Sequence, residues 1–184
     1  TKIQINRNFK VVNPKSLGID YKHQENSFND FSKQVLLPQK VSQQGPTLSI
    51  ADVNSDGLED FFVGGAKNQS AVLYIQNTKG MFEKSNQINF EKDKAYEDNG
   101  SLFFDADNDG DLDLYITRGG YEFSENSLFL QDRLYLNNGK GIFNKSTGLP
   151  KMLTNTKTVK SIDFDVDGDL DLVVGGHVIP GKYP

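Results

Sequence analysis

Cysteine and tryptophan are absent from the 184-residue chain, and histidine and methionine occur only twice each. Without cysteine the chain can form neither disulfides nor thiolate metal sites, and it has no cysteine nucleophile. No apolar run approaches the roughly 20 residues that cross a bilayer as a helix, and no signal-peptide pattern begins at Thr1. A start without methionine is expected for a mature product or for a piece of a longer protein.

Acidic residues are concentrated in a few places. More than half of the 25 Asp and Glu residues lie in three nine-residue segments, 52–60, 105–113 and 163–171. Elsewhere Lys and Arg outnumber them, so the formal charge of −5 is a property of these segments. Three bound divalent cations would bring the charge to about +1, so the acidic balance identifies no class of partner.

Each segment follows the pattern D-x-[DN]-x-D-G-x-x-D. Oxygen ligands at positions 1, 3 and 5, a main-chain carbonyl at 7 and a carboxylate at 9 can surround a calcium-sized cation, and glycine at 6 permits the sharp turn. Without a cation, so many like charges would repel one another. The predicted side-chain ligands are Asp52, Asn54, Asp56 and Asp60; Asp105, Asp107, Asp109 and Asp113; and Asp163, Asp165, Asp167 and Asp171. Leu58, Asp111 and Asp169 are predicted to contribute carbonyls only.

Two alternatives compete with this interpretation. An EF-hand needs a bidentate Glu at position 12 and flanking helices, but position 12 is Val63, Ile116 or Val174, within short apolar runs typical of strands. A single acidic surface turn would explain one copy, whereas three copies in register favour a repeat. Sites without the twelfth-position Glu should bind calcium weakly and fill outside the cytosol. Asn54 is a neutral ligand, so the first site is expected to be the weakest.

The strand pattern repeats around these loops. Strands are expected at 47–51, 60–64, 71–76 and 81–84, then at 101–104, 113–117, 133–137 and 142–145, and finally at 158–162 and 171–176. Four strands per unit are the anatomy of a propeller blade. Residues 6–11, centred near Phe9, resemble the closing strands at Phe82 and Phe143 and are predicted to be the last strand of a preceding blade.

The predicted fold is therefore all-β, with four-stranded antiparallel blades. Residues 1–45 are assigned to that last strand and a long connection, 46–98 and 99–157 to two blades, and 158–184 to the first half of another. A propeller closes with about four to eight blades, so two and a half blades leave faces and edges exposed. We expect further blades from the same parent chain or from other chains to complete the structure.

The three loops, each running into an apolar strand, resemble the FG-GAP/VCBS repeats of integrin α-type β-propellers. Other stretches, such as 23–26, 60–65, 132–137 and 176–184, are similar to bacterial VCBS proteins that carry an ASPIC/UnbV domain and are related to cartilage acidic protein. The resemblance implies a calcium-stabilised propeller of about seven blades. The ASPIC/UnbV segment itself is absent from this sequence.

The expected function is a binding or scaffolding module for protein or glycan ligands at the bacterial cell surface, with structural Ca²⁺ at three sites. Arg118, Tyr121, Glu122 and Phe123, in the longest loop, are candidate ligand contacts, where the rings could stack on a sugar or pack over the blade. The alternative is the propeller part of a secreted polysaccharide lyase or hydrolase. Its candidate catalytic residues are His23, Glu25, Asp30 and His177. Nucleic acid is not an expected partner.

Overall fold

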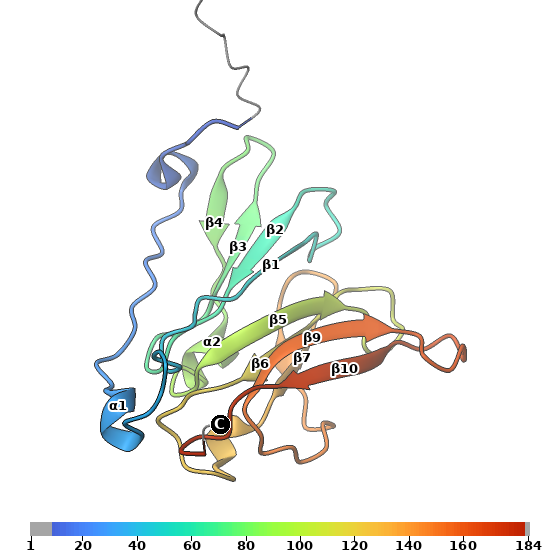
Figure 1. Ribbon diagram of the computed structural model, residues 1–184. Coiled ribbons are helices and arrows are strands. Elements are labelled where there is room, and N and C mark those ends of the chain that lie inside the picture. Colours follow the sequence, from blue (N-terminus) through green and yellow to red (C-terminus); the bar gives the residue numbers. More distant parts are fainter. Residues whose placement is uncertain (1–8, 183–184) are drawn as a thin grey trace, which may run out of the picture.

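The computed structural model describes residues 9–182, and β-strands dominate it (Figure 1). The strands form three antiparallel sheets. The first sheet has the order β1-β2-β3-β4, with β1 (Leu48–Ala51), β2 (Asp60–Val63), β3 (Val72–Gln76) and β4 (Phe82–Lys84). The second has the order β5-β6-β7-β8, with β5 (Asp98–Phe104), β6 (Asp113–Arg118), β7 (Arg133–Leu136) and β8 (Asn144–Lys145). The third contains β9 (Thr156–Ile162) and β10 (Asp171–Gly176).

Each acidic loop joins the first two strands of a sheet, as the repeat pattern predicts. The register pairs Ala51 with Asp60, Phe104 with Asp113 and Ile162 with Asp171, so a loop begins and ends at adjacent ladder positions in all three sheets. The tips of the three hairpins lie on the right-hand side of Figure 1. The strand-loop-strand prediction is confirmed, and β5 and β9 begin a few residues earlier than their apolar runs suggested.

The described residues contain four short helical segments that were not predicted, two of them before the first strand. They are the 3₁₀ turns Pro14–Leu17 and Leu128–Leu130, α1 (Asp30–Lys33) and α2 (Ile88–Lys92). Residues 9–11 of the strand predicted at 6–11 are not in a strand, since no described strand pairs with them, and residues 6–8 lie outside the described part. Among the described residues, no helix is long and apolar enough to span a bilayer.

The main core lies between the first and second sheets. Its buried members come from both sheets and from α2: Ala51, Val53, Phe62, Ala71, Leu73, Phe90, Leu114, Ile116, Tyr135 and Phe143. Phe90 makes edge contacts with the rings of Phe62 and Tyr135 and stacks near Phe143. A smaller cluster of Phe104, Tyr115 and Val159 joins the second sheet to the third. The sheets are thus held together face to face by apolar side chains.

The first strands of neighbouring sheets meet through small residues. The Ser49 hydroxyl donates to the carbonyl of Ser101 at 2.9 Å, joining β1 to β5. Gly100 passes so close to β9 that a Cβ there would lie 2.4 Å from the carbonyl oxygen of Lys157. The aromatic residues of the core, by contrast, come from the later strands and from α2. The spacing between sheets is therefore narrow at their first strands and wider where the aromatic rings pack.

The two ends of the stack expose apolar surface. Leu48 and Ile50 project from β1 and, with Phe61 and Phe82, line a shallow apolar pocket of about 300 Å³ on the outer face of the first sheet. At the other end Val173 is exposed, and within residues 9–182 no strand pairs with the free edge of β10. Exposed faces and edges of this kind are normally covered in stable β proteins.

Candidate metal centres

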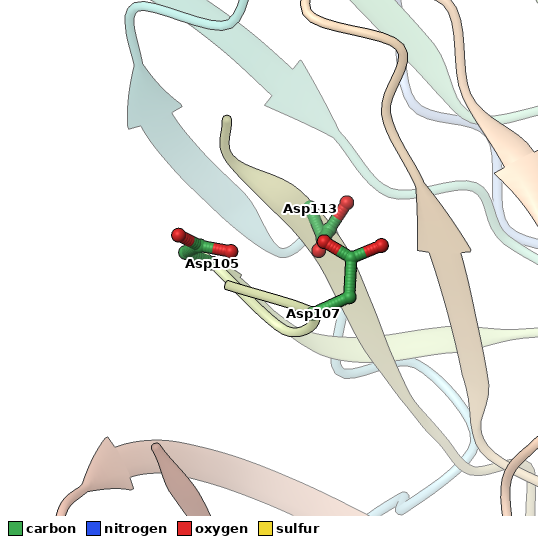
Figure 2. A group of neighbouring side chains, drawn as sticks. All are labelled: Asp105, Asp107 and Asp113. Atoms are coloured by element: carbon green, nitrogen blue, oxygen red, sulfur yellow. The ribbon is translucent and has the colours of Figure 1, made fainter. Parts of the chain in front are cut away.

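The second acidic loop folds back on itself because two of its residues are left-handed. Asn108 has φ 58° and Gly110 φ 90°, values that asparagine and glycine adopt more readily than other residues. This turn places Asp105 and Asp107, on the loop, beside Asp113 at the start of β6 (Figure 2). One carboxylate oxygen from each lies within 4.8 Å of the others, so the three can share one cation.

Hydrogen bonds hold part of this geometry in place. The backbone N–H of Gly110 donates to Oδ2 of Asp105 at 3.0 Å. Asp113 accepts from Ala106 N through Oδ2 and from Asn137 N, beside β7, through Oδ1, each at 2.8 Å. Asp113 therefore fixes both the loop and the neighbouring strand.

One oxygen of this cluster has no protein partner. Oδ1 of Asp105 is buried and accepts no hydrogen bond. An unsatisfied buried carboxylate oxygen is costly, and a hard cation is its natural partner. Burial raises the pKa of Asp113, and the nearby carboxylates of Asp107 and Asp111 raise it further. A bound divalent cation would reverse this penalty, so the residues present fit a Ca²⁺ ion.

The third loop repeats the arrangement with Asp163, Asp165 and Asp171, whose carboxylate oxygens also lie within 4.8 Å of one another. Gly168 N donates to Oδ2 of Asp163, and Oδ1 of Asp163 is again buried without a partner. Val166 occupies the left-handed position, with φ 61°. Two Asp-rich clusters in this chain could therefore hold metal ions.

The first loop differs in its hydrogen bonds. Both oxygens of Asp52 are occupied, because Oδ1 accepts from Asp56 N at 3.1 Å and Oδ2 from Gly57 N at 2.8 Å. The Asn54 amide donates to the Asp56 carboxylate at 3.1 Å. With Asn54 in place of an Asp, this loop forms no three-carboxylate group within the part of the chain that the structure describes. Its prediction as the weakest calcium site stays a prediction.

Asp60, at position 9 of the first loop, is buried and accepts from Val53 N at 3.1 Å and from Gln76 N at 2.8 Å. The other predicted ligands lie at positions 5 and 7. The position-5 carboxylates of Asp56, Asp109 and Asp167 each accept a hydrogen bond from the N–H two residues later, which shapes the turn. At position 7, Oδ1 of Asp111 is buried without a partner, whereas Asp169 accepts from the Asn108 amide of the second loop. The carbonyl roles of Leu58, Asp111 and Asp169 stay predictions.

The longest loop has its predicted ligand contacts turned inward. Tyr121 and Phe123 are buried, and the Lys33 ammonium donates to the carbonyls of both at 2.9 Å. Glu122 pairs with Lys67 and accepts from the Asn26 amide, while Arg118 is buried. The observed contacts of these side chains are intramolecular. Their role in ligand binding stays a prediction.

The residues weighed for catalysis do not form one group. His23 Nε2 lies 2.8 Å from Oε1 of Glu25. Asp30 is buried and accepts backbone hydrogen bonds from Val41 and Ser42, a structural role. His177 lines a separate pocket of about 230 Å³, and burial, then the charge of Lys157, lower its pKa.

Sequence reasoning missed a cluster of charges around Tyr96. The guanidinium of Arg118 stacks on this ring at 3.4 Å from its centroid, and Arg133 and Lys145 approach the same ring at 5.2 and 5.3 Å. Arg133 pairs with Asp98 and, at 3.4 Å, with Asp93. The only signal in the sequence was charged residues flanking apolar strand cores, which surface strands also show.

Comparison with known families supports the repeat assignment. A search of curated proteins gave no significant match. The FG-GAP-like repeat matches residues 21–116, which include the first two acidic loops. This match spans just over half of the chain, and the three sheets with their shared loop position agree with it. The chain therefore belongs to the FG-GAP-like repeat family.

Proposed function

We propose that the chain is part of a calcium-stabilised β-propeller that acts as an extracellular binding or scaffolding module for protein or glycan ligands at the bacterial cell surface. The FG-GAP match carries this proposal, because such repeats suggest a propeller-like binding module and are typically extracellular. The metal part rests on the Asp105 and Asp163 clusters, each with a buried, unpartnered carboxylate oxygen. The first loop is the third proposed structural calcium site, and its ligands are weaker than those of the other two.

In this proposal the three sheets are successive propeller blades. Residues 46–98 and 99–157 form complete blades, and residues 158–184 form the first half of another. A further blade would pack on the apolar outer face at Leu48 and Ile50, and the remaining strands of the half blade would pair with the free edge of β10, in a propeller of about seven blades. These blades come from the same parent chain or from other chains. A closer kinship with ASPIC/UnbV-associated VCBS proteins is part of the same proposal.

Calcium acts structurally in this reading. In each hairpin the cation joins the loop to the start of the second strand, so its binding free energy adds to the free energy of folding. Affinities in the range of about 10⁻⁴ to 10⁻³ M are expected, as in other extracellular calcium modules. Such sites stay filled outside the cell and empty in the cytosol.

Native mass spectrometry with and without a chelator tests the metal part. The wild-type chain should carry up to three calcium ions. The double variant Asp105→Asn/Asp107→Asn and the double variant Asp163→Asn/Asp165→Asn should each carry one fewer. Asp113 is left intact because it also holds Asn137. Glu59→Gln removes an exposed loop carboxylate outside the predicted ligand set and should retain all ions.

The binding part needs its own measurement. Surface plasmon resonance against neutral and acidic polysaccharides and against surface proteins should reveal a ligand that is bound and released unchanged. Turnover of a polysaccharide, lost on replacing His23 or His177, would instead support the enzyme alternative. Absence of any calcium in the first experiment would contradict the structural-metal proposal whatever the ligand screen finds.

A further inference from the structure

A pocket of about 290 Å³ opens beside the Tyr96 cluster, at the ends of β7 and β8. Its lining includes Tyr96, Gln131, Arg133, Lys145, Thr147 and Lys151. This volume is close to the lower limit for small-molecule sites, enough for one small group. Three of the pocket's nine lining residues are cationic, and one, Asp132, carries a carboxylate.

The strands place this pocket far from the acidic loops. In the β5–β6 ladder, Asp98 pairs with Arg118 at one end and Phe104 pairs with Asp113 at the other. Arg133 of β7 pairs with Ile116, near the Arg118 end. The pocket and the second acidic loop therefore lie toward opposite ends of the same sheet, and a ligand here would bind independently of calcium.

The hydrogen bonds of Arg133 leave one of its three guanidinium nitrogens without a partner. Its Nη1 donates to the hydroxyl of Tyr135 at 2.5 Å and its Nη2 donates to Asp98. Its Nε is buried and has no hydrogen-bond acceptor. Arg133 is only 4% exposed, and it lines the pocket. An unsatisfied buried guanidinium N–H is costly in a folded protein.

Arg118 adds a second unsatisfied cation behind the pocket. It is fully buried against the Tyr96 ring, and none of its three guanidinium nitrogens donates a hydrogen bond. Stacking on an aromatic face compensates a buried guanidinium only in part. Arg118 therefore contributes positive potential next to the pocket without an acidic partner of its own.

The charges around the pocket do not cancel. Four cationic residues line the pocket or lie beside it: Arg118, Arg133, Lys145 and Lys151. Three carboxylates pair with them or line the pocket: Asp93, Asp98 and Asp132. Burial raises the pKa of Asp132 to about 6, which weakens its contribution below neutral pH. Lys145 pairs with Asp93, at 2.9 Å, whereas Lys151 has no ion pair among the described residues. The cluster has an excess of positive charge.

We propose that this pocket binds a tetrahedral oxyanion, a sulfate or phosphate group carried by the ligand of the module. A planar carboxylate is best recognised by the two-pronged edge of an arginine, but Arg133 already uses Nη1 and Nη2 internally. The donors that remain at the pocket are the ammonium groups of Lys145 and Lys151 and the Thr147 hydroxyl, and the unpartnered Nε of Arg133 is buried beside them. Such an arrangement suits an anion that accepts hydrogen bonds around a tetrahedron.

This inference deepens the proposed binding function by naming the charged group that the ligand carries. Arg118 covers one face of the Tyr96 ring at 3.4 Å, which leaves at most the other face for stacking on a sugar ring. The cationic lining of the pocket makes the anion the feature that this proposal names. Sulfated and phosphorylated ligands share this chemistry, and the experiment separates them.

The test is isothermal titration of the whole chain in calcium buffer with sodium sulfate, sodium phosphate and sodium acetate at constant ionic strength. Sulfate or phosphate should bind at least tenfold more tightly than acetate. Lys151→Gln, at an exposed position that the fold does not need, should weaken this binding about tenfold. Lys140→Gln, an exposed lysine on the β7–β8 turn outside the pocket, should leave it unchanged.

A second arm identifies the source of the anion. Dextran sulfate, a phosphorylated mannan and polygalacturonate are compared as ligands, and the sulfated or the phosphorylated polymer should compete with the free ion while the uronate polymer does not. Equal binding of acetate, or equal loss in Lys151→Gln and Lys140→Gln, would overturn the proposal. Because the calcium-loop variants should keep their sulfate binding, a failure here is distinct from a failure of the calcium proposal.

Discussion

Asn108 of the second acidic loop donates a hydrogen bond from its side-chain amide to the carboxylate of Asp169 in the third. Neither residue is among the clustered carboxylates, yet each lies in a loop that could hold a cation. The two candidate metal centres are thus joined by a contact between neighbouring sheets.

Replacing Asn108 with Gly should uncouple the two loops. Glycine keeps the left-handed backbone at φ 58° and removes only the amide. We expect calcium at the third loop to bind about two- to fivefold more weakly, because an exposed hydrogen bond to a carboxylate contributes about 0.5–1 kcal/mol. Calorimetric calcium titration measures the change. The control is Ser55→Gly, which introduces glycine at the same position of the first loop. An equal loss of calcium affinity in the two variants would show that loop flexibility, and not the lost hydrogen bond, is the cause.

Val166→Asn should stabilise the third hairpin. Val166 is 85% exposed and has φ 61°, a backbone conformation that a β-branched residue adopts only at a cost of roughly 1–2 kcal/mol. Asn108 shows that asparagine fits the equivalent position. Thermal unfolding in calcium buffer should show a gain of about 1 kcal/mol. Phe164→Ala, which removes another apolar group that is 80% exposed in the same loop, should give no such gain.

Phe90→Ala should be among the most destabilising single changes in the chain. Phe90 is 1% exposed and touches aromatic rings from both main sheets, so its truncation leaves a cavity at their junction. The expected loss is about 3–5 kcal/mol in the free energy of unfolding, measured by urea denaturation. Ile88→Ala, in the same helix but 63% exposed, should cost less than about 0.5 kcal/mol. Similar losses in the two variants would contradict the packing described for α2.

Glu97 should make stability fall as pH rises. Burial, followed by the charges of Glu25, Glu122, Asp98 and Asp30, raises its pKa from 4.5 to about 8. Between these two values the folded chain holds a proton that the unfolded chain has released. The contribution of protonated Glu97 to the free energy of unfolding is therefore complete below pH 4.5 and is lost as pH rises through about 8.

Glu97→Gln should remove this dependence. The variant should match the wild-type chain near pH 4.5 and become more stable than it toward pH 8, by at most about 5 kcal/mol. Urea denaturation at a series of pH values gives the comparison. Glu83→Gln, on the exposed part of β4, serves as the control. Parallel curves for Glu97→Gln and the wild-type chain would refute a raised pKa at this residue.

The strands and their loops could be predicted from the sequence because their signals are local. A run such as residues 113–117 combines β-branched and aromatic residues after a glycine turn, and the repeat supplied the same signal three times. The acidic residues likewise lie within nine positions, so the pattern indicated the Asp105 and Asp163 clusters, although the position-5 residues Asp109 and Asp167 are not in them. The strands and the acidic clusters both depend on residues that are close together in the sequence.

Long-range contacts could not be predicted in this way. α2 is only five residues long, and its position depends on Phe90 reaching the rings of Phe62 and Tyr135, which are distant in sequence. Arg118 was considered for surface contact, yet it is buried because the fold places Tyr96 against it. No spacing rule in a single strand signals such a partner.

The small residues along the first strands let neighbouring sheets lie closer together there than at their later strands. Gly100 allows β5 and β9 to approach almost backbone to backbone, while aromatic side chains hold the later strands apart. Neighbouring sheets therefore approach more closely at their first strands than at their later strands. In the proposed propeller, the small residue at position 100 would help to set the angle between successive sheets and so the number that closes the ring. A larger side chain there would clash with the Lys157 carbonyl and force β5 and β9 apart.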